Sequence, residues 1–211
     1  MSAAQPRRKI VLQMMTTLDG RLDDPMAWLH GVSDDQYQEI DRIYAGYDTV
    51  LVGRTTYEEM AAYWPGAVSE GTETNRRMAH RMNTVKKLVF SRSGASPLTP
   101  WSSVEQVVAA TDSDLAKHLA ALKAEPGGDI HLSGGASFAQ SVVALGLVDE
   151  YRFFVYPTVS PGKSWFAKLP SGLDLQLIDS RSYENGVVGL HYVPREATDR
   201  VHRETFTDML T

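Results

Sequence analysis

The chain has 211 residues, of which 43% are hydrophobic and 22% are charged, proportions that are typical of one globular domain with a single core. A net charge of -5 and a sequence pI of about 5.7 give no basic surface for nucleic acid or an anionic membrane. Because the chain has no cysteine, disulfides, thiolate nucleophiles and thiolate metal sites are excluded. We therefore expect a soluble, cytoplasmic protein.

The sequence divides into a short extension, one domain and a tail. Residues 1–8 are polar and basic, so we expect a disordered N-terminal extension in which Arg7 and Arg8 carry solvated charges. The domain covers residues 9–195, and residues 196–211 form a C-terminal tail. No apolar stretch reaches the ~20 residues that a membrane span requires.

The first predicted elements are a buried strand, a loop and a helix. Residues 10–15 form an apolar run that ends at an Asp-Gly turn, Asp19-Gly20,. Residues 21–33 predict an irregular loop, long enough to act as a lid over a site. Ser33 is a suitable N-cap for a helix whose apolar face repeats every three or four residues until Gly46,.

Strands and helices then alternate along the chain. Further strands are predicted at 49–52, 87–90, 104–110, 129–132 and 151–156, and further helices at 54–63, 77–83, 113–123 and 136–145,. Two last strands, 173–182 and 187–193, flank Asn185-Gly186, the dipeptide typical of a type I′ hairpin turn,. This order predicts a three-layer α/β domain with a mostly parallel mixed sheet and a C-terminal antiparallel hairpin.

Two glycine turns follow apolar strands and open helices. Their residues are Gly53, Arg54, Thr55 and Thr56 in the first turn, and Gly134, Gly135, Ala136 and Ser137 in the second. Free N–H groups at a helix start bind phosphate, and glycine lets the phosphate approach the backbone. Both turns also fit ordinary tight connections. The chain has neither G-x-G-x-x-G nor a Walker A motif, which disfavours a Rossmann fold and a P-loop nucleotidase,.

Two arginines stand near strand ends. Arg92 lies between two serines, Ser91 and Ser93, and Arg54 lies in the first glycine turn. Arginine beside hydroxyl groups suits a ribose 2′-phosphate, which distinguishes NADPH from NADH. The alternative is that both arginines are plain surface charges.

These pieces occur in an order that resembles the dihydrofolate reductase superfamily, most closely the branch of the reductase domain of bacterial riboflavin biosynthesis. The matching segments are 16–20, 48–65, 88–92, 134–137 with 147–150, 155–157 and 185–194. The resemblance covers residues 9–195. It implies a dihydrofolate-reductase-like fold and an NADPH cofactor.

The resemblance also implies roles for single residues. The cofactor's phosphates and adenosine would be held by Gly53, Arg54, Thr55, Thr56, Ser91, Arg92, Gly134, Gly135, Ala136 and Ser137. The nicotinamide would be lined by Met15, Thr16, Asp19 and Gly20.

The substrate side is less defined. Asp19 is the candidate catalytic residue, relaying a proton through water, although Asp-Gly also simply makes a turn. Trp28 is a candidate to stack on a flat substrate, or equally a tryptophan tucked under a loop. Asp35 and Glu39 are candidate substrate-binding carboxylates on the first helix. Neither they nor Asp34 falls in the register of the carboxylate that holds pterin in dihydrofolate reductases.

We therefore expect an NADPH-dependent reductase that transfers hydride to a small conjugated heterocycle or carbonyl compound, related to pterins or flavin precursors. The alternatives are a nucleotide-binding module without turnover and an authentic dihydrofolate reductase. The six histidines show no metal-ligand pairing,, so no metal is expected. Residues 151–156 and the terminal hairpin concentrate aromatic and β-branched residues near one predicted sheet edge,. The tail after Arg195 could cover this edge and leave a monomer, but we expect a second copy to cover it in a homodimer.

Overall fold

The computed structural model describes residues 7–22, 24–94, 96–162, 164–169 and 173–195. The strands are β1 (Ile10–Thr17), β2 (Tyr47–Gly53), β3 (Lys86–Ser91), β4 (Val104–Val108), β5 (Asp129–Gly134), β6 (Glu150–Tyr156), β7 (Leu175–Ser182) and β8 (Val188–Pro194). The helices are α1 (Pro25–Trp28), α2 (Asp34–Tyr44), α3 (Arg54–Tyr63), α4 (Glu73–Thr84), α5 (Asp112–Ala124) and α6 (Ala136–Ala144), with short 3-10 turns η1 (Ala67–Ser69) and η2 (Trp165–Lys168).

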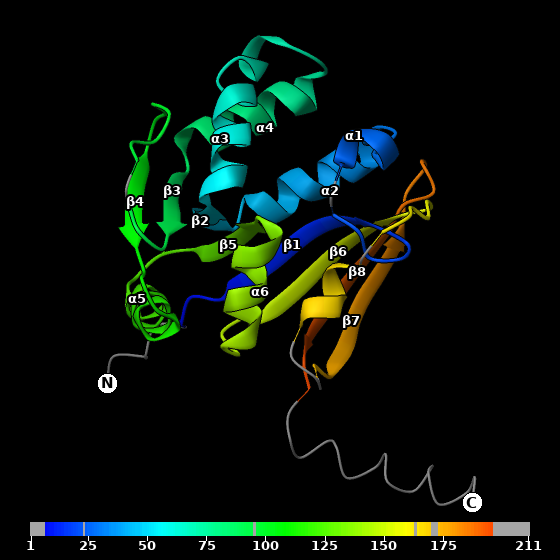
Figure 1. Cartoon of the computed structure of the whole chain (residues 1–211). Helices are drawn as coiled ribbons and strands as arrows, with labels where there is room; N and C mark the ends of the chain where they lie inside the picture. The colour runs from blue at the N-terminus through cyan, green and yellow to red at the C-terminus, as the bar shows by residue number, and fades with distance from the viewer. Residues whose placement is uncertain (1–6, 23, 95, 163, 170–172, 196–211) are drawn as a thin grey trace, which may run out of the picture.

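All eight strands form one sheet in the order β4-β3-β2-β5-β1-β6-β8-β7 (Figure 1). The pairs from β4 across to β6 are parallel, whereas β8 pairs antiparallel with β6 and β7. The predicted α/β class, with a mostly parallel sheet and a C-terminal antiparallel hairpin, is confirmed.

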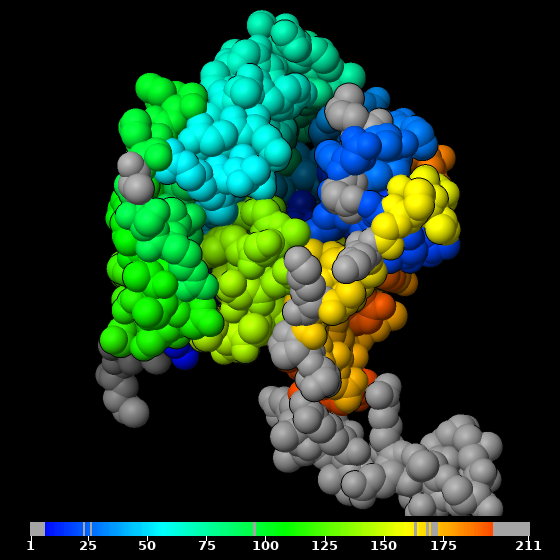
Figure 2. All heavy atoms as spheres, viewed as in Figure 1, coloured from blue at the N-terminus to red at the C-terminus, as the bar shows by residue number. Residues whose placement is uncertain are grey.

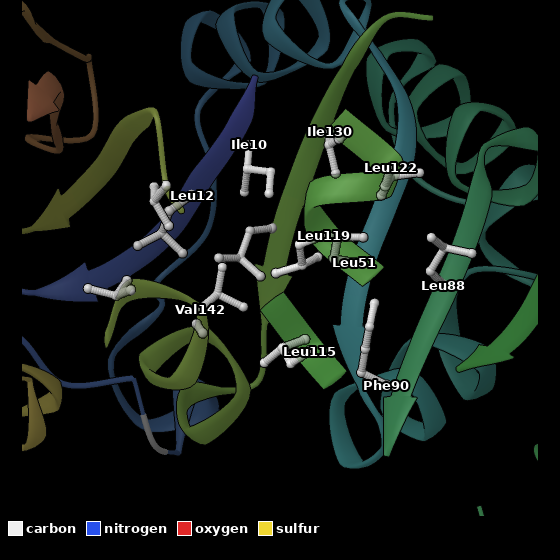
Figure 3. Close-up of a cluster of buried hydrophobic side chains, with 14 of the residues drawn as sticks. Ile10, Leu12, Leu51, Leu88, Phe90, Leu115, Leu119, Leu122, Ile130 and Val142 are labelled. Atoms are coloured by element: carbon white, nitrogen blue, oxygen red, sulfur yellow. The ribbon is translucent and has the colours of Figure 1, made fainter. Parts of the chain in front are cut away.

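Helices cover both faces of the sheet, because the parallel strands carry apolar side chains on both sides. One face packs against α5 and α6, and Figure 3 shows its buried side chains: Ile10, Leu12, Leu51, Leu88, Phe90, Leu115, Leu119, Leu122, Ile130 and Val142. The other face packs against α2, α3 and α4, through residues such as Ile40, Tyr57 and Met82. The domain therefore has three layers.

Three local expectations about helices need correction. The loop 21–33 contains the short helix α1, and α4 begins at Glu73 rather than near residue 77. Helix α5 is capped by Thr111, whose hydroxyl accepts from the Asp114 N–H while the Asp114 carboxylate accepts from the Thr111 N–H,. The helix therefore begins at Asp112, one residue before the predicted start at 113.

The hairpin turn also differs from the predicted type I′. Tyr183 N–H donates to Val187 O and Gly186 N–H donates to Tyr183 O, which leaves a three-residue loop. Gly186 has a φ of 78°, whereas Asn185 has no positive φ. This pattern is a type I turn followed by a left-handed glycine, because a type I′ turn needs two residues with positive φ.

Arg8 is not the solvated charge that we expected. Its side chain is 4% exposed, and its guanidinium donates to the carboxylate of Asp48, to the Thr49 hydroxyl and to the Gly128 carbonyl. The ion pair and the carbonyl compensate the buried charge. Residues 1–6 of the expected extension and the expected tail 196–211 lie outside the described residues.

Within the described part of the chain, no helix combines the length and the apolar character needed to cross a membrane.

Candidate functional site

A cavity of about 550 Å³ opens at the carboxyl ends of the parallel strands. It lies between the starts of α3 and α6 and the ends of β3 and β4. Its lining residues are Gly53, Arg54, Thr55, Thr56, Phe90, Ser91, Arg92, Ala109, Leu115, Gly135, Ala136, Ser137, Phe138 and Ser141. We call this group of residues the phosphate end. Nine of its members were predicted from the sequence as cofactor-binding residues, and Gly134 immediately precedes Gly135.

The topology explains why the two glycine turns meet. Strands β2 and β5 are parallel neighbours, with Val52 paired to Gly134, so their carboxyl ends lie side by side. Gly53 is the N-cap of α3 and Gly135 is the N-cap of α6, and no side chain caps either helix. Both helix starts therefore present main-chain N–H groups to one cavity, the arrangement that favours a diphosphate.

The glycines allow the two turns to touch. A Cβ atom on Gly135 would lie 2.7 Å from Thr56 Oγ1, and a Cβ atom on Gly53 would lie 3.1 Å from the Cβ atom of Phe138. Gly134 has a φ of 112°, a backbone conformation that residues other than glycine rarely adopt,. A larger residue at Gly53 or Gly135 would push the turns apart, whereas one at Gly134 would strain the backbone.

Both predicted phosphate-binding arginines line the cavity, and both have protein partners. Arg54 donates to the carbonyl oxygens of Ser96, at 2.8 Å, and Pro97. Arg92 donates from Nη2 to Asp112 Oδ1 at 2.5 Å. The cationic groups lie at the end of the cavity formed by β3, β4 and α3.

Sequence analysis missed the apolar wall of this cavity. Phe90 and Phe138 stack with ring centroids 5.0 Å apart, and Ala109 and Leu115 complete the wall beside them. In the sequence these residues look like ordinary core positions of a strand and two helices. Only the position of Phe138, three residues after the Gly135 turn, pointed to the site.

The predicted nicotinamide residues lie at the carboxyl end of β1, outside the cavity lining. We call residues 15–20, together with Trp165, the strand end. The main-chain N–H of Trp165 donates to Gly20 O at 2.8 Å, and its indole Nε1 donates to Ala136 O at 3.2 Å. The buried Trp165, which the sequence did not reveal, thus connects the strand end to the second glycine turn. Figure 2 shows a hollow bounded by α3, α6 and the blue N-terminal segment.

Asp19 lies in the turn after β1. Its Oδ1 atom accepts from Thr17 Oγ1 at 2.6 Å and from the Ser160 N–H at 3.3 Å. The hydrogen bond from Thr17 lowers the pKa of Asp19 from its usual value,. Asp19 is therefore an ionised carboxylate at neutral pH, and it also joins the turn to the segment after β6.

The three predicted substrate-binding residues do not converge. Trp28 is 2% exposed and packs edge-on against Tyr156, as expected of a tryptophan tucked under a loop. Asp35 accepts from Ser33 Oγ and from the Glu184 N–H, and the hydrogen bond from Ser33 lowers the pKa of Asp35.

Glu39 lies further along α2. It forms ion pairs with Arg42 and Arg181 beside the hairpin. This placement removes Glu39 from the candidate site.

The polar residue that α2 buries is Gln36, which the sequence analysis did not select. Its Nε2 donates to the Tyr156 hydroxyl at 3.1 Å, and its Oε1 accepts from Asn185 at 2.8 Å. Tyr156 also contacts the sulfur of Met15. The inward side chain of this helix is thus an amide rather than a carboxylate. Among the described residues, no three His, Cys, Asp or Glu side chains gather where they could hold a metal ion.

Comparisons with known proteins give a consistent result. A family model for the RibD C-terminal domain matches residues 8–189. The uncharacterized protein YyaP of Bacillus subtilis is 28% identical over 187 residues, which cover 88% of this chain and 95% of YyaP.

Solved structures share the fold. A pyrimidine reductase-like protein from Corynebacterium diphtheriae superposes with a TM-score of 0.62 at 17% identity, over 90% of this chain and 92% of that chain. Dihydrofolate reductase from Enterococcus faecalis, solved with NADP(H), superposes with a TM-score of 0.59 at 10% identity, over 89% and 97%. The expected dihydrofolate-reductase-like fold is confirmed.

Proposed function

The chain belongs to the RibD C-terminal domain family, and from this premise we propose that it is an NADPH-dependent reductase acting on a small conjugated heterocycle or carbonyl compound. Membership confirms the resemblance to the reductase branch of riboflavin biosynthesis. The observation that carries the proposal is the cavity at the phosphate end, where two uncapped helix starts and two arginines meet.

The residues of the phosphate end fit a pyridine dinucleotide. The cavity of about 550 Å³ lies within the ~300–1,000 Å³ range of small-molecule sites. The N–H groups that open α3 and α6 would hold the diphosphate, and Gly53 and Gly135 keep that space free of side chains,. Arg54, Ser91 and Arg92 would hold the 2′-phosphate, while Phe90, Ala109 and Leu115 offer an apolar surface to the adenosine.

The strand end would position the reacting groups. When bound, NADPH supplies a hydride from C4 of its nicotinamide. Met15, Thr16 and Gly20 would line that ring, and Trp165 fixes the distance between Gly20 and the turn at Ala136. Asp19 would orient a water molecule, because its ionised carboxylate accepts hydrogen bonds and the water then delivers the proton,.

Turnover tests this function. Purified protein is mixed with NADPH and each of a panel of dihydrofolate, pteridine, flavin-precursor and quinone substrates, and the loss of nicotinamide absorbance is followed. Oxidation that depends on one class of substrate supports the reductase. Binding of NADPH without oxidation across the panel would support the nucleotide-binding module instead.

Authentic dihydrofolate reductase is the second candidate enzyme, and Gln36 argues against it. Pterin recognition in those enzymes uses a carboxylate on the first helix, whereas the inward polar side chain of α2 is an amide held by Tyr156 and Asn185. Turnover of dihydrofolate with inhibition by methotrexate would establish it.

We also propose a homodimer, formed through the hairpin. Strand β7 is an edge of the sheet, and Leu177 and Ile178 are 50% and 52% exposed there. An exposed apolar edge favours a second copy as its cover. Light scattering on a gel-filtered sample should give twice the chain mass of 23.4 kDa, and a single chain mass at all concentrations would exclude the dimer.

A further inference from the structure

The two arginines of the phosphate end differ in what neutralises them. Two guanidinium nitrogens of Arg54 donate to main-chain carbonyl oxygens. The carboxylate nearest to this guanidinium, that of Glu58, lies 3.6 Å away. Arg92 also donates to main-chain carbonyls, those of Ala109 and Ala110, but in addition it donates directly to the carboxylate of Asp112 at 2.5 Å. Carbonyl partners orient a guanidinium without cancelling its charge, whereas a carboxylate cancels it.

The position of Asp112 is set by the chain around it. Asp112 is the first residue of α5, and Ala109 and Leu115 on either side of it line the cavity. Arg92 reaches this segment from the end of β3, where its Nη1 lies 3.4 Å from Ala109 O. The Arg92–Asp112 pair therefore stands at the rim of the cavity that the adenosine half of a dinucleotide would occupy.

Capping of α5 does not require Asp112. The capping box is formed by Thr111 and Asp114, which bond to each other's main-chain N–H groups. The hydrogen bond that the Asp112 carboxylate accepts comes instead from Arg92. The Asp112 carboxylate thus bonds to a residue that lines the cavity, and it does not cap the helix.

We propose that Asp112 is a cofactor-specificity residue that weakens the preference for NADPH over NADH through Arg92, an inference that rests on the proposed function. A 2′-phosphate must take Arg92 away from Asp112, and its negative charge is repelled by the carboxylate. A 2′-hydroxyl meets neither obstacle, because it donates a hydrogen bond to a carboxylate, as in other NAD sites.

The expected size of the effect of Asp112 on cofactor preference follows from the exposure of the Arg92 and Asp112 side chains. The side chains of Arg92 and Asp112 are 51% and 66% exposed, and ion pairs at such positions are weak because water screens them. A 2′-phosphate therefore still displaces Asp112, and the wild-type protein still prefers NADPH. Asp112 narrows that preference rather than reversing it.

The test compares the affinities of NADPH and NADH for wild type and Asp112→Asn by nicotinamide fluorescence. The amide retains the shape of the side chain and removes its charge. We expect NADPH to bind more tightly by on the order of twofold to fivefold, while NADH binds equally well or less well. Glu105→Gln is the matched control, because it removes one negative charge from β4, where Glu105 pairs with Lys86 instead. It should leave both affinities unchanged.

The same substitution made in the Arg92→Ala variant tests whether Asp112 acts through Arg92. In Arg92→Ala protein, the gain caused by Asp112→Asn should shrink, since no guanidinium remains to be released. Thermal melting of each variant verifies that it is folded. An unchanged ratio of NADPH to NADH affinity in Asp112→Asn, or an equal gain without Arg92, would overturn this inference while leaving the proposed function intact. Failure of wild type to bind either dinucleotide would overturn both.

Discussion

The phosphate end and the strand end of the candidate site are built in different ways. The phosphate end is a cavity formed by main-chain turns, with uncapped helix starts at Gly53 and Gly135. At the strand end and on α2, the polar side chains are engaged with the protein itself. Asp19 bonds to Thr17, and Asp35 bonds to Ser33.

In the proposed function, this difference would separate recognition of a cofactor from recognition of a substrate. Main-chain N–H groups at helix starts bind any diphosphate, so the phosphate end can be common to reductases with different substrates. In the proposed reductase, substrate choice would depend on side chains at the strand end and on α2, whose inward polar residue is Gln36. Of the four predictions that follow, the first three test this division, beginning with the largest expected effect, and the fourth concerns the stability of the strand that leads into the second glycine turn.

Removing either arginine of the phosphate end should separate the two cofactors. Arg54→Ala or Arg92→Ala should weaken NADPH binding by about 1.5–3 kcal/mol, the value of a charge-assisted hydrogen bond, and should leave NADH binding nearly unchanged. Fluorescence titration with both dinucleotides measures the effect. Equal losses for NADPH and NADH would show that the 2′-phosphate binds elsewhere.

A substitution that pushes the two glycine turns apart should also impair cofactor binding. In Gly135→Ala, the new Cβ atom would lie 2.7 Å from Thr56 Oγ1, and the displacement should cost about 1–3 kcal/mol of NADPH affinity. Thr56→Ala in the same chain removes the contacting oxygen and should restore part of the loss. Gly66→Ala, where the nearest atom is 3.8 Å away, is the control. Normal NADPH binding by Gly135→Ala would contradict the close contact of the turns.

A substitution at the strand end should affect turnover and spare cofactor affinity. Asp19→Asn removes the charge that would orient the donor water in the proposed reaction, so kcat should fall on the order of tenfold or more, with NADPH affinity within about twofold of wild type. Exposed Asp34, on α2, supplies the control variant Asp34→Asn. If kcat is unchanged in Asp19→Asn, the carboxylate serves only to hold its turn.

A buried histidine on β5, the strand that leads into the second glycine turn, should make the free energy of unfolding depend on pH. Burial lowers the pKa of His131, on β5, from 6.5 to about 3. Between these values the unfolded chain binds a proton that the folded chain does not, so stability falls as pH decreases below 6.5, approaching about 1.4 kcal/mol per pH unit for this group. Urea unfolding at several pH values should show a smaller slope for His131→Gln than for wild type. Identical slopes would mean that His131 is protonated in the folded state.

Sequence reasoning worked where the signal is local. A glycine turn between an apolar strand and a helix identifies a helix start, and parallel strand order brings Gly53 and Gly135 together. Sequence reasoning failed where two residues in contact lie far apart along the chain. Trp165 reaches Gly20 and Ala136, and Arg92 reaches Asp112, only because the fold places these residues side by side.

Burial was also difficult to predict. Arg8 reads as a terminal charge, but its partner Asp48 lies 40 residues away. The apolar wall formed by Phe90 and Phe138 has the same residue types as a core, so its exposure to a cavity cannot be inferred from composition. For α2, periodicity predicted the helix and its apolar face, but it did not indicate that Gln36 is the buried polar residue.

The most direct test of the account is a fluorescence titration of the wild-type protein with NADPH, followed by displacement with 2′,5′-ADP. The fragment carries only the adenosine, the 2′-phosphate and one 5′-phosphate, so it probes the phosphate end alone. We predict saturable binding of one NADPH per chain and its full displacement by the fragment. No saturation at high micromolar NADPH, or binding that the fragment does not displace, would contradict the assignment of the cavity as the cofactor site.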